Sequence, residues 1–211
     1  MRKLLIGWGL LLCGLLSACS EDDYTAPAYR EDLADLLTAA DGRPACLVTD
    51  AGDSLPVVNG SRLAAAQPDT LYRVRALYVR VPSGAELYDM VQVLTPVPAL
   101  YPPEAVKTDP LTVVAVWRGG RYLNFRLSVP TSGGGQVFGV VEEGLDTLPG
   151  GTRLLQLSLL HDQGADGEYY SREVYLSSPL TRYASLLRAG VDSVEVRIAT
   201  YTGTYLRRYP Y

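Results

Sequence analysis

The sequence predicts an all-β protein in which a small barrel-like domain is followed by an antiparallel β-sandwich. Three observations support this fold class. Apolar and polar residues alternate within short segments, Gly-rich turns separate these segments, and no helical pattern runs longer than residues 180–188. Of the 211 residues, 47% are apolar and 20% are charged, which is enough apolar side chain to bury a core. The length suits two small domains.

Three short strands are expected at the start of the first domain. Asp41-Gly42 and Gly52-Asp53 are turn sequences between apolar runs, and Asp-Gly in particular marks tight hairpins. The strands predicted around these turns cover residues 31–39, 44–50 and 54–58. A one-turn helix over residues 32–38 is the alternative, because three leucines in that stretch would share one helical face.

A long strand over residues 70–81 is expected next. Its apolar residues change parity part-way, which predicts a β-bulge or sharp bend near Ala76, as in strands that coil around small barrels. A turn at Ser83-Gly84 leads into a partner strand over 85–94. Four prolines within eight residues then prevent a regular ladder, so the first domain is placed at 31–100 and the second at 108–211.

The second domain repeats the alternating pattern more simply. Leu111, Val113, Ala115 and Trp117 alternate, so they are expected to share one face of a strand, and Gly119-Gly120 turns the chain into the next one. Further strands are predicted at residues 123–129, 137–141, 155–159, 169–176 and 194–198. This spacing is typical of an antiparallel sandwich.

The first residues have the features of a lipoprotein leader. Met1-Arg2-Lys3 is basic, an apolar run follows, and Leu16-Ser17-Ala18-Cys19 resembles the bacterial lipobox. We therefore expect residues 1–18 to be a signal peptide and Cys19 to be lipidated with acyl chains such as palmitate, on a tether over 19–30. An ordinary secreted protein with an incidental cysteine is the alternative.

An acidic block directly follows Cys19. Ser20, Glu21, Asp22 and Asp23 resemble the export signal that sends Bacteroidetes lipoproteins to the outer leaflet of the outer membrane. This resemblance implies a lipid-anchored protein exposed on the cell surface. The alternative is that the block is a solvated beginning of the tether, because acidic residues are common in such segments.

In its layout, nearly the whole mature chain resembles the NigD-like lipoproteins of Bacteroidetes. Besides the lipobox and acidic block, the resemblance rests on Leu47–Asp53, on the hairpin Trp117–Asn124, and on His161–Leu176 with Glu168-Tyr169-Tyr170. It implies an N-terminal OB-like barrel joined to a C-terminal β-sandwich. The family motifs shape turns and strands and carry no known catalytic set, and the family name points to bacteriocin-related gene clusters.

Most catalytic chemistries lack the residues they need in this chain. His161 is the only histidine, and after processing Lys107 is the only lysine, preceded by Val106 where a phosphate loop needs glycine. Cys46 is the one cysteine left with a free thiol, and its apolar neighbours favour a buried small side chain over a reactive thiol. A net charge of −4 argues against nucleic acid as a partner. We therefore expect no enzyme activity, cofactor or metal, although a carboxylate pair for glycoside hydrolysis could lie anywhere among 23 acidic residues.

One acidic loop has partial calcium-site spacing. Asp162, Asp166, Glu168 and Glu173 occupy positions one, five, seven and twelve of a twelve-residue window, with Gly167 at position six. Position three is Gly164, and strands rather than helices are expected on both sides. A solvated acidic hairpin loop is therefore the preferred interpretation.

Tyrosines gather at the C-terminus and suggest a ligand surface. Tyr201, Tyr205, Tyr209 and Tyr211 recur at odd positions, so in a continuing strand they would share one face. We expect Tyr201 to be in the core, and Tyr205, Tyr209 and Tyr211 to be candidates for contacting a glycan or protein. The alternative is that these tyrosines reflect β-strand propensity alone.

The sequence thus predicts a non-catalytic outer-membrane surface lipoprotein that binds a glycan or protein ligand outside the cell. The alternative, from another functional class, is a structural or bacteriocin-immunity-related envelope protein that associates with another membrane component. In either case, the lipid anchor makes the membrane a partner.

Overall fold

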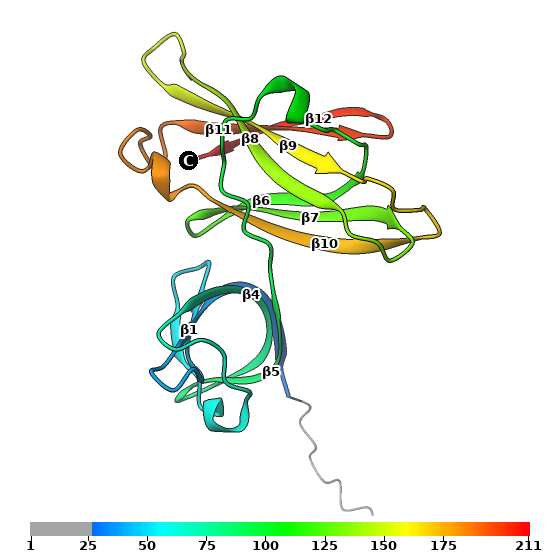
Figure 1. The fold of residues 1–211 in the computed structure, drawn as a ribbon. Helices are drawn as coiled ribbons and strands as arrows, with labels where there is room; N and C mark the ends of the chain where they lie inside the picture. Colours follow the sequence, from blue (N-terminus) through cyan, green and yellow to red (C-terminus); the bar gives the residue numbers. More distant parts are fainter. Residues whose placement is uncertain (1–26) are drawn as a thin grey trace, which may run out of the picture.

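The protein is all-β, as predicted. The computed structural model describes residues 27–211, and over these residues it contains twelve strands in three sheets and three short 3-10 turns, Gly60–Arg62, Pro103–Ala105 and Thr181–Tyr183. Figure 1 shows two β-domains, one above the other, with the chain entering through the lower one. Over the described residues, no helix is long and apolar enough to cross a membrane.

The N-terminal domain is a single coiled sheet of five strands. These are β1 (Tyr29–Thr38), β2 (Pro44–Thr49), β3 (Ser54–Pro56), β4 (Leu71–Val81) and β5 (Gly84–Gln92). They lie in the order β3-β2-β1-β4-β5, and Figure 1 looks nearly along the axis around which they coil. The expected strands are confirmed, and the helical alternative over residues 32–38 is not adopted.

The two edge strands of this sheet come together at one seam. Val57 and Ala85 form an isolated parallel bridge, and the Val58 N–H donates to the Ala85 carbonyl at 3.0 Å. Gly84 makes the approach possible, because a Cβ built there would lie 2.0 Å from the carbonyl oxygen of Pro56. The strand order and the bridged seam fit a small, partly open barrel of the OB type.

The irregularity predicted in the strand over residues 70–81 lies instead in its partner β5. Leu77 pairs with Asp89 and Tyr78 with Leu87, which leaves Tyr88 of β5 as the extra residue. β4 itself keeps one inward face, because Val74, Ala76 and Tyr78 are all buried in the barrel, so the predicted bulge near Ala76 is wrong. A bulge in either strand of a pair increases the local twist and helps the sheet to coil. The barrel interior contains Ala34, Leu36, Leu47, Leu55, Val74, Ala76, Tyr78, Ala85 and Leu87.

The C-terminal domain is a sandwich of a three-stranded and a four-stranded sheet. Its strands are β6 (Thr112–Gly119), β7 (Tyr122–Thr131), β8 (Val137–Thr147), β9 (Arg153–Asp162), β10 (Tyr170–Pro179), β11 (Ser193–Thr200) and β12 (Gly203–Pro210). The sheet orders are β10-β7-β6 and β12-β11-β9-β8. All pairs are antiparallel except β9 and β11, which run parallel because the chain crosses over through β10 and the turn at Thr181–Tyr183.

The β6 strand corrects the predicted alternation. The pairing with β7 passes from Val113 opposite Leu127 to Ala115 opposite Arg126, which leaves Val114 as an extra residue. This bulge reverses the parity, so Val113 and Val116 pack on the sandwich core while Ala115 and Trp117 face the barrel. The expected shared face for residues 111–117 is therefore wrong beyond Val113.

The proline-rich linker between β5 and β6 packs along the sandwich domain. Leu94 forms a bridge with Leu176, Ala99 with Val141, Thr108 with His161 and Leu111 with Thr200. The Ala99 N–H donates to Val140 O at 3.0 Å, and Glu142 N–H donates to Ala99 O at 2.8 Å. The linker thus covers strand positions that would otherwise lack backbone partners.

Two expected boundaries need adjustment. The sequence places Tyr29 and Arg30 in the tether, but in the structure they pair with Val79 and Tyr78 and belong to β1. The helical pattern over residues 180–188 becomes one 3-10 turn, Thr181–Tyr183, in which Leu180 and Tyr183 anchor the crossover to the core. Tertiary packing of these apolar residues outweighs their weak helical periodicity.

Candidate functional site

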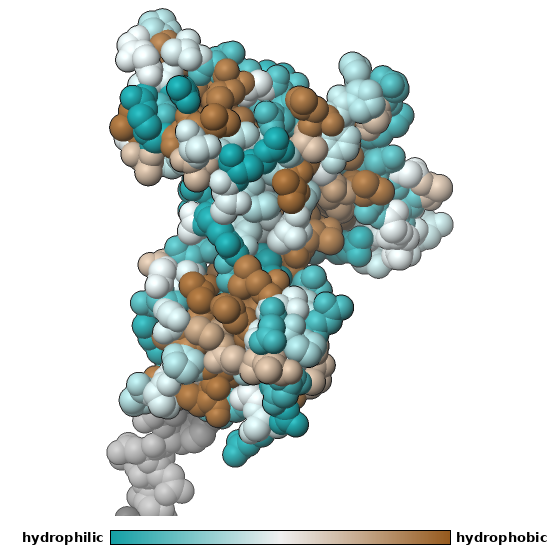
Figure 2. All heavy atoms as spheres, turned by 60° about the vertical axis from the view of Figure 1, so that its left-hand side comes forward, coloured by the Kyte–Doolittle hydropathy of each residue, from teal (hydrophilic) through white to brown (hydrophobic). Residues whose placement is uncertain are grey.

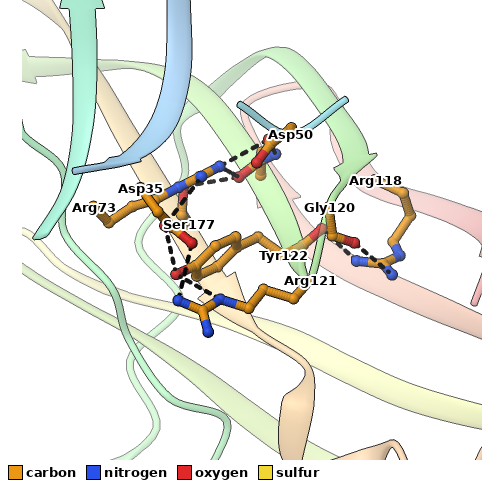
Figure 3. A network of polar contacts seen from close by, with 9 residues as sticks. Asp35, Asp50, Arg73, Arg118, Gly120, Arg121, Tyr122 and Ser177 are labelled. Atoms are coloured by element: carbon orange, nitrogen blue, oxygen red, sulfur yellow. Dashed lines mark hydrogen bonds and ion pairs between the residues drawn. The ribbon is translucent and has the colours of Figure 1, made fainter. Parts of the chain in front are cut away.

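The two domains meet through the outer face of the three-stranded sheet. On β7 and β10, Leu123, Phe125 and Leu176 point into the sandwich, so alternation turns Asn124 and Ser177 toward the barrel. There they meet side chains from β1, β4 and the turn between β2 and β3. Figure 3 shows these side chains converging between the domains.

Arg73 of β4 is the centre of this interface. It is 4% exposed, and its guanidinium donates to Asp50 at 2.8 Å, Asp35 at 3.4 Å, Ser177 Oγ at 3.0 Å and Asn124 Oδ1 at 3.2 Å. Asp35 and Asp50 belong to the barrel, whereas Ser177 and Asn124 belong to the sandwich. One buried guanidinium therefore connects both domains. Its N–H groups have hydrogen-bond acceptors, and its charge is balanced by two carboxylates.

An aromatic residue and a second arginine complete the network. The ring of Tyr122 lies under Arg73, with the guanidinium carbon 4.0 Å from the ring centroid, and its hydroxyl donates to Asp35 at 2.9 Å. Burial and the hydrogen bond to Asp35 raise the pKa of Tyr122. Arg121 pairs with the other oxygen of Asp35 at 2.9 Å, while Arg118 donates to the carbonyls of Tyr122 and Gly120 and closes the hairpin (Figure 3). The interface is thus a continuous polar cluster.

A cleft of about 510 Å³ opens beside this network, between the barrel and the sandwich. This size falls in the range of about 300–1,000 Å³ for small-molecule sites. Strands β1 and β4 and the 49–53 turn form one wall, and β6, β7 and β10 form the other. The lining residues are Arg30, Glu31, Asp32, Leu33, Thr49, Asp50, Ala51, Asp53, Arg75, Tyr78, Ala115, Trp117, Arg126 and Tyr175. Figure 2 shows the two lobes joined across a narrower waist.

The charges of the cleft are largely paired with one another. Arg75 contacts Glu31 at 3.3 Å, and Arg126 makes a two-pronged contact with Glu173 at 2.7 and 3.0 Å. This pairing lowers the pKa of Glu173. On the opposite rim, Asp53 pairs with Arg80 at 3.0 Å. Arg30 and Asp32 are the lining charges that form no ion pair with another described residue, and they carry opposite signs. The cleft therefore presents many hydrogen-bonding groups with little net uncompensated charge.

Three aromatic residues lie in the cleft in different environments. Tyr78 is buried and donates to Asp32 at 2.8 Å, and burial together with this bond raises its pKa to about 12. Tyr175 lies beneath the guanidinium of Arg75, 4.9 Å from its ring centroid. Trp117 is half-buried, and within residues 27–211 it has no aromatic or cationic stacking partner. Its indole is therefore the one ring of the cleft free to stack on a ligand.

Comparisons with known proteins point to one group of structures. No protein-family model and no curated protein matches the sequence. A solved structure of a NigD-like immunity protein from Bacteroides caccae is 28% identical, has a TM-score of 0.70, and covers 89% of this chain and 99% of its own. The predicted resemblance to the NigD-like family is confirmed.

Two further solved structures share the fold of this chain. A candidate toxin-related protein from Parabacteroides distasonis is 17% identical with a TM-score of 0.69, and the alignment covers 87% of this chain and 93% of that one. A candidate lipoprotein from Bacteroides fragilis is 12% identical with a TM-score of 0.54, and the coverage is 86% and 96%. At these identities the likeness concerns the arrangement of the two domains.

Three of the four C-terminal tyrosines lie on the sandwich core with part of each ring exposed. Tyr205, Tyr209 and Tyr211 are half-buried and pack on the sandwich core, and the hydroxyls of Tyr205 and Tyr209 are 2.7 Å apart. Tyr201, expected in the core, is 56% exposed. It lies in the turn between β11 and β12 instead of in a continuing strand, so its side chain leaves the face that Ile198 and Tyr205 occupy.

The four carboxylates of the predicted calcium loop do not converge. Asp166 is engaged by its own loop, accepting from Thr131 Oγ1 at 2.5 Å, from Ser132 N and Oγ at 2.9 and 2.7 Å, from Gly134 N at 3.0 Å and from Gln136 Nε2 at 2.8 Å. These donors hold the pKa of Asp166 well below its usual range. Glu173 points to Arg126, Glu168 to Gln163, and Asp162 to the Gly164 N–H. Within the described part of the chain, no group of three potential ligands is close enough for a metal.

Of the remaining candidate residues, His161 and Cys46 have packing roles, and the others lie outside the described residues. His161 is 1% exposed, with Nδ1 at 2.9 Å from Asp109 O and Nε2 at 2.9 Å from Gln136 Oε1, and it stacks on Phe138. Cys46 is half-buried with its sulfur 3.2 Å from Ser54 Oγ. Cys19, Ser20, Glu21, Asp22 and Asp23 lie outside the described residues.

Sequence reasoning missed the interdomain network and the cleft. In the sequence, Arg73, Asp35 and Asp50 look like ordinary polar residues on exposed strand faces. The two sandwich residues that Arg73 contacts, Asn124 and Ser177, are 51 and 104 residues away along the chain. One usable signal was Asn124 in a strand of otherwise apolar and aromatic residues. A polar amide in such a strand suggests an outer face that is covered by another layer.

Proposed function

We propose that this chain is a non-catalytic, lipid-anchored binding protein of the cell surface whose ligand occupies the interdomain cleft. The observation that carries the proposal is Trp117, an unstacked indole in a cleft of about 510 Å³ with hydrogen-bonding groups on both walls. Concave sites that combine an aromatic face with a few placed polar groups are the usual form of binding sites. The ligand outside the cell is a glycan or a protein.

Catalysis finds little support in the residues of the site. The only histidine is buried elsewhere, with both ring nitrogens already close to oxygen atoms. The lining carboxylates Glu31, Asp50 and Asp53 are each paired with an arginine, and Asp32 accepts the Tyr78 hydroxyl. A binding role requires only that these paired side chains form hydrogen bonds to a ligand, without any change in their ion pairs.

The binding proposal can be tested through the single tryptophan of the mature chain. The sequence has two tryptophans, and Trp8 lies in the leader, so the emission of residues 20–211 reports on Trp117 alone. Ligands found on glycan and peptide arrays should shift this emission and bind Trp117→Ala at least about tenfold more weakly. The control Tyr169→Ala removes a ring that is 88% exposed outside the cleft, and should bind normally. Ligands that bind both variants equally would place the site elsewhere.

Anchoring through Cys19 is part of the same proposal and has its own test. Cys19→Ala should release the protein from membranes, because the acyl chains would supply the membrane affinity. Replacing Glu21, Asp22 and Asp23 by alanine should protect the protein from protease added to whole cells. A Cys19→Ala protein that still sediments with membranes after a high-salt wash would contradict the anchor.

An immunity-related role is the second candidate. It rests on the NigD-like immunity protein from Bacteroides caccae, which aligns over 99% of its length at 28% identity. In this role the protein associates with another envelope component and protects the producing cell. A deletion strain should then become sensitive to culture supernatants of related strains, and the gene with Cys19 intact should restore resistance. Equal sensitivity of deletion and parent strains would argue against this role.

A further inference from the structure

The composition of the cleft limits the class of ligand that it can hold. Half of its lining residues are charged, with three arginines and four carboxylates among fourteen residues. The buried centres of protein–protein interfaces are depleted in charged residues, so this lining is a poor match for a protein partner. Only Leu33, Ala51 and Ala115 add aliphatic surface, which leaves little to bury an apolar peptide side chain.

The pairing of the charges argues against an ionic ligand. Arg75 and Arg126 are already held by Glu31 and Glu173, so an anion would have to compete with carboxylates at 3.3 and 2.7 Å. It would also face the acidic side chains of the 49–53 turn. A cation would have to displace Arg73 from Asp50 and Arg80 from Asp53, at 2.8 and 3.0 Å. Among the described residues, Arg30 and Asp32 are the two lining charges without an ion-pair partner, and because their signs are opposite they favour neither an anion nor a cation. A neutral polar molecule avoids the cost of breaking the ion pairs.

A pyranose ring meets the remaining requirements. It has an apolar C–H face that can stack on an indole, and a rim of hydroxyl groups that both donate and accept hydrogen bonds. Trp117 offers the free ring. The ion-paired carboxylates keep unused lone pairs that accept from hydroxyls, and the arginines keep N–H groups that donate to them, so a sugar can bind without breaking an ion pair.

We propose that the interdomain cleft binds a neutral oligosaccharide, with one sugar stacked on Trp117 and its hydroxyls held by the paired side chains of Glu31–Arg75 and the Asp53 rim. This inference rests on the proposed function and names the ligand class for the same site. The barrel supplies most of the polar rim and the sandwich supplies the stacking ring, so binding requires both domains in their docked arrangement.

The test follows Trp117 emission in residues 20–211 during titration with maltotriose, mannotriose, chitotriose and a wider array of neutral oligosaccharides. Acidic probes, trigalacturonate and a heparin tetrasaccharide, are titrated in parallel. At least one neutral saccharide should give a saturable shift, and no acidic probe should bind more tightly. Trp117→Ala should lose at least about tenfold in affinity, measured calorimetrically. Asp53→Ala keeps the ring and should lose about threefold or more, which tests the rim even if Trp117→Ala folds poorly.

Several results would overturn the inference. These are saturable binding of acidic but not neutral probes, neutral saccharides that bind Trp117→Ala as tightly as the parent, or no saturable shift with any neutral saccharide. An acidic saccharide or a peptide that binds in a Trp117-dependent way would remove only the neutral-oligosaccharide class and keep the proposed function. If ligands of every class bind Trp117→Ala as tightly as the parent protein, both the saccharide inference and the proposed cleft site are wrong.

Discussion

At the scale of single residues, Arg73 is the side chain on which most of the interface depends. Its charge is almost completely removed from water, and it is matched by Asp35 and Asp50, whose side chains are 14% and 19% exposed. Removing one member of a buried ion pair leaves the others without compensation, which costs much more than breaking a surface pair. The same guanidinium also holds Ser177 and Asn124 of the other domain.

Arg73→Ala should therefore lower the free energy of unfolding by about 3–5 kcal/mol. The matched control is Arg208→Ala, whose side chain is half exposed and pairs with Glu195 at 3.0 Å on the surface. That change should cost less than about 1 kcal/mol. Urea unfolding of both variants provides the comparison, and similar losses would contradict the central role of Arg73.

Tyr78 gives a second prediction at this scale, in alkaline solution. Its pKa in the folded protein is raised to about 12, because the ring is buried and its hydroxyl is bonded to Asp32. The unfolded chain loses this proton near pH 10, whereas the folded chain retains it. The stabilisation from neutral Tyr78 is thus complete below pH 10 and is lost between about pH 10 and 12. Melting temperatures should fall over this range, and less steeply in Tyr78→Phe. An unchanged slope in that variant would assign the loss to other groups.

At the scale of elements, the seam of the barrel depends on a glycine. Gly84 has a φ of +144°, and its Cα faces the Pro56 carbonyl so closely that a side chain has no room. The seam is held by the isolated bridge between Val57 and Ala85 and by the hydrogen bond from the Val58 N–H to the Ala85 carbonyl. Bulges in β5, β6 and β8 play a comparable part, because each changes which face of its strand is buried.

Gly84→Ala should destabilise the barrel by more than the strain of its backbone conformation alone. Gly52 is a suitable control, since it also has a positive φ, +92°, but a Cβ there meets nothing within 4 Å. Gly52→Ala should cost about 1–2 kcal/mol from backbone strain, and Gly84→Ala should cost more because the Pro56 carbonyl must move. Chemical denaturation of both variants checks this, and equal costs would show that the seam is not tightly packed.

At the scale of the whole molecule, the two domains form one body through the polar cluster and the linker. The hairpin between β6 and β7 is pressed against the barrel, because a Cβ on Gly119 would lie 2.3 Å from Asp50 Oδ2 and 2.7 Å from Asn124 Nδ2. The cleft exists only in this docked arrangement, since its walls come from different domains. Domain docking and ligand binding should therefore respond together.

Gly119→Ala should loosen the domains without unfolding either one. The expected signs are faster proteolysis in the linker between residues 94 and 111, a larger radius of gyration in small-angle X-ray scattering, and a changed Trp117 emission. Gly135→Ala is the control, because a Cβ there meets nothing within 4 Å. An unchanged radius and digestion pattern in Gly119→Ala would mean that the cluster relaxes around the added methyl group.

The sequence alone determined the all-β class, nearly every strand and the NigD-like resemblance. These properties follow from local patterns, because alternation and turn residues act within a few positions of each other. Tertiary structure decided which faces are covered. The bulge at Val114 turns Trp117 away from the sandwich core, and the turn that contains Tyr201 exposes the tyrosine ring. Arg73 donates a hydrogen bond to Ser177, which is 104 residues away in the sequence. The cleft is built from such long-range contacts, and a period-two pattern does not specify which strand face a second domain will cover.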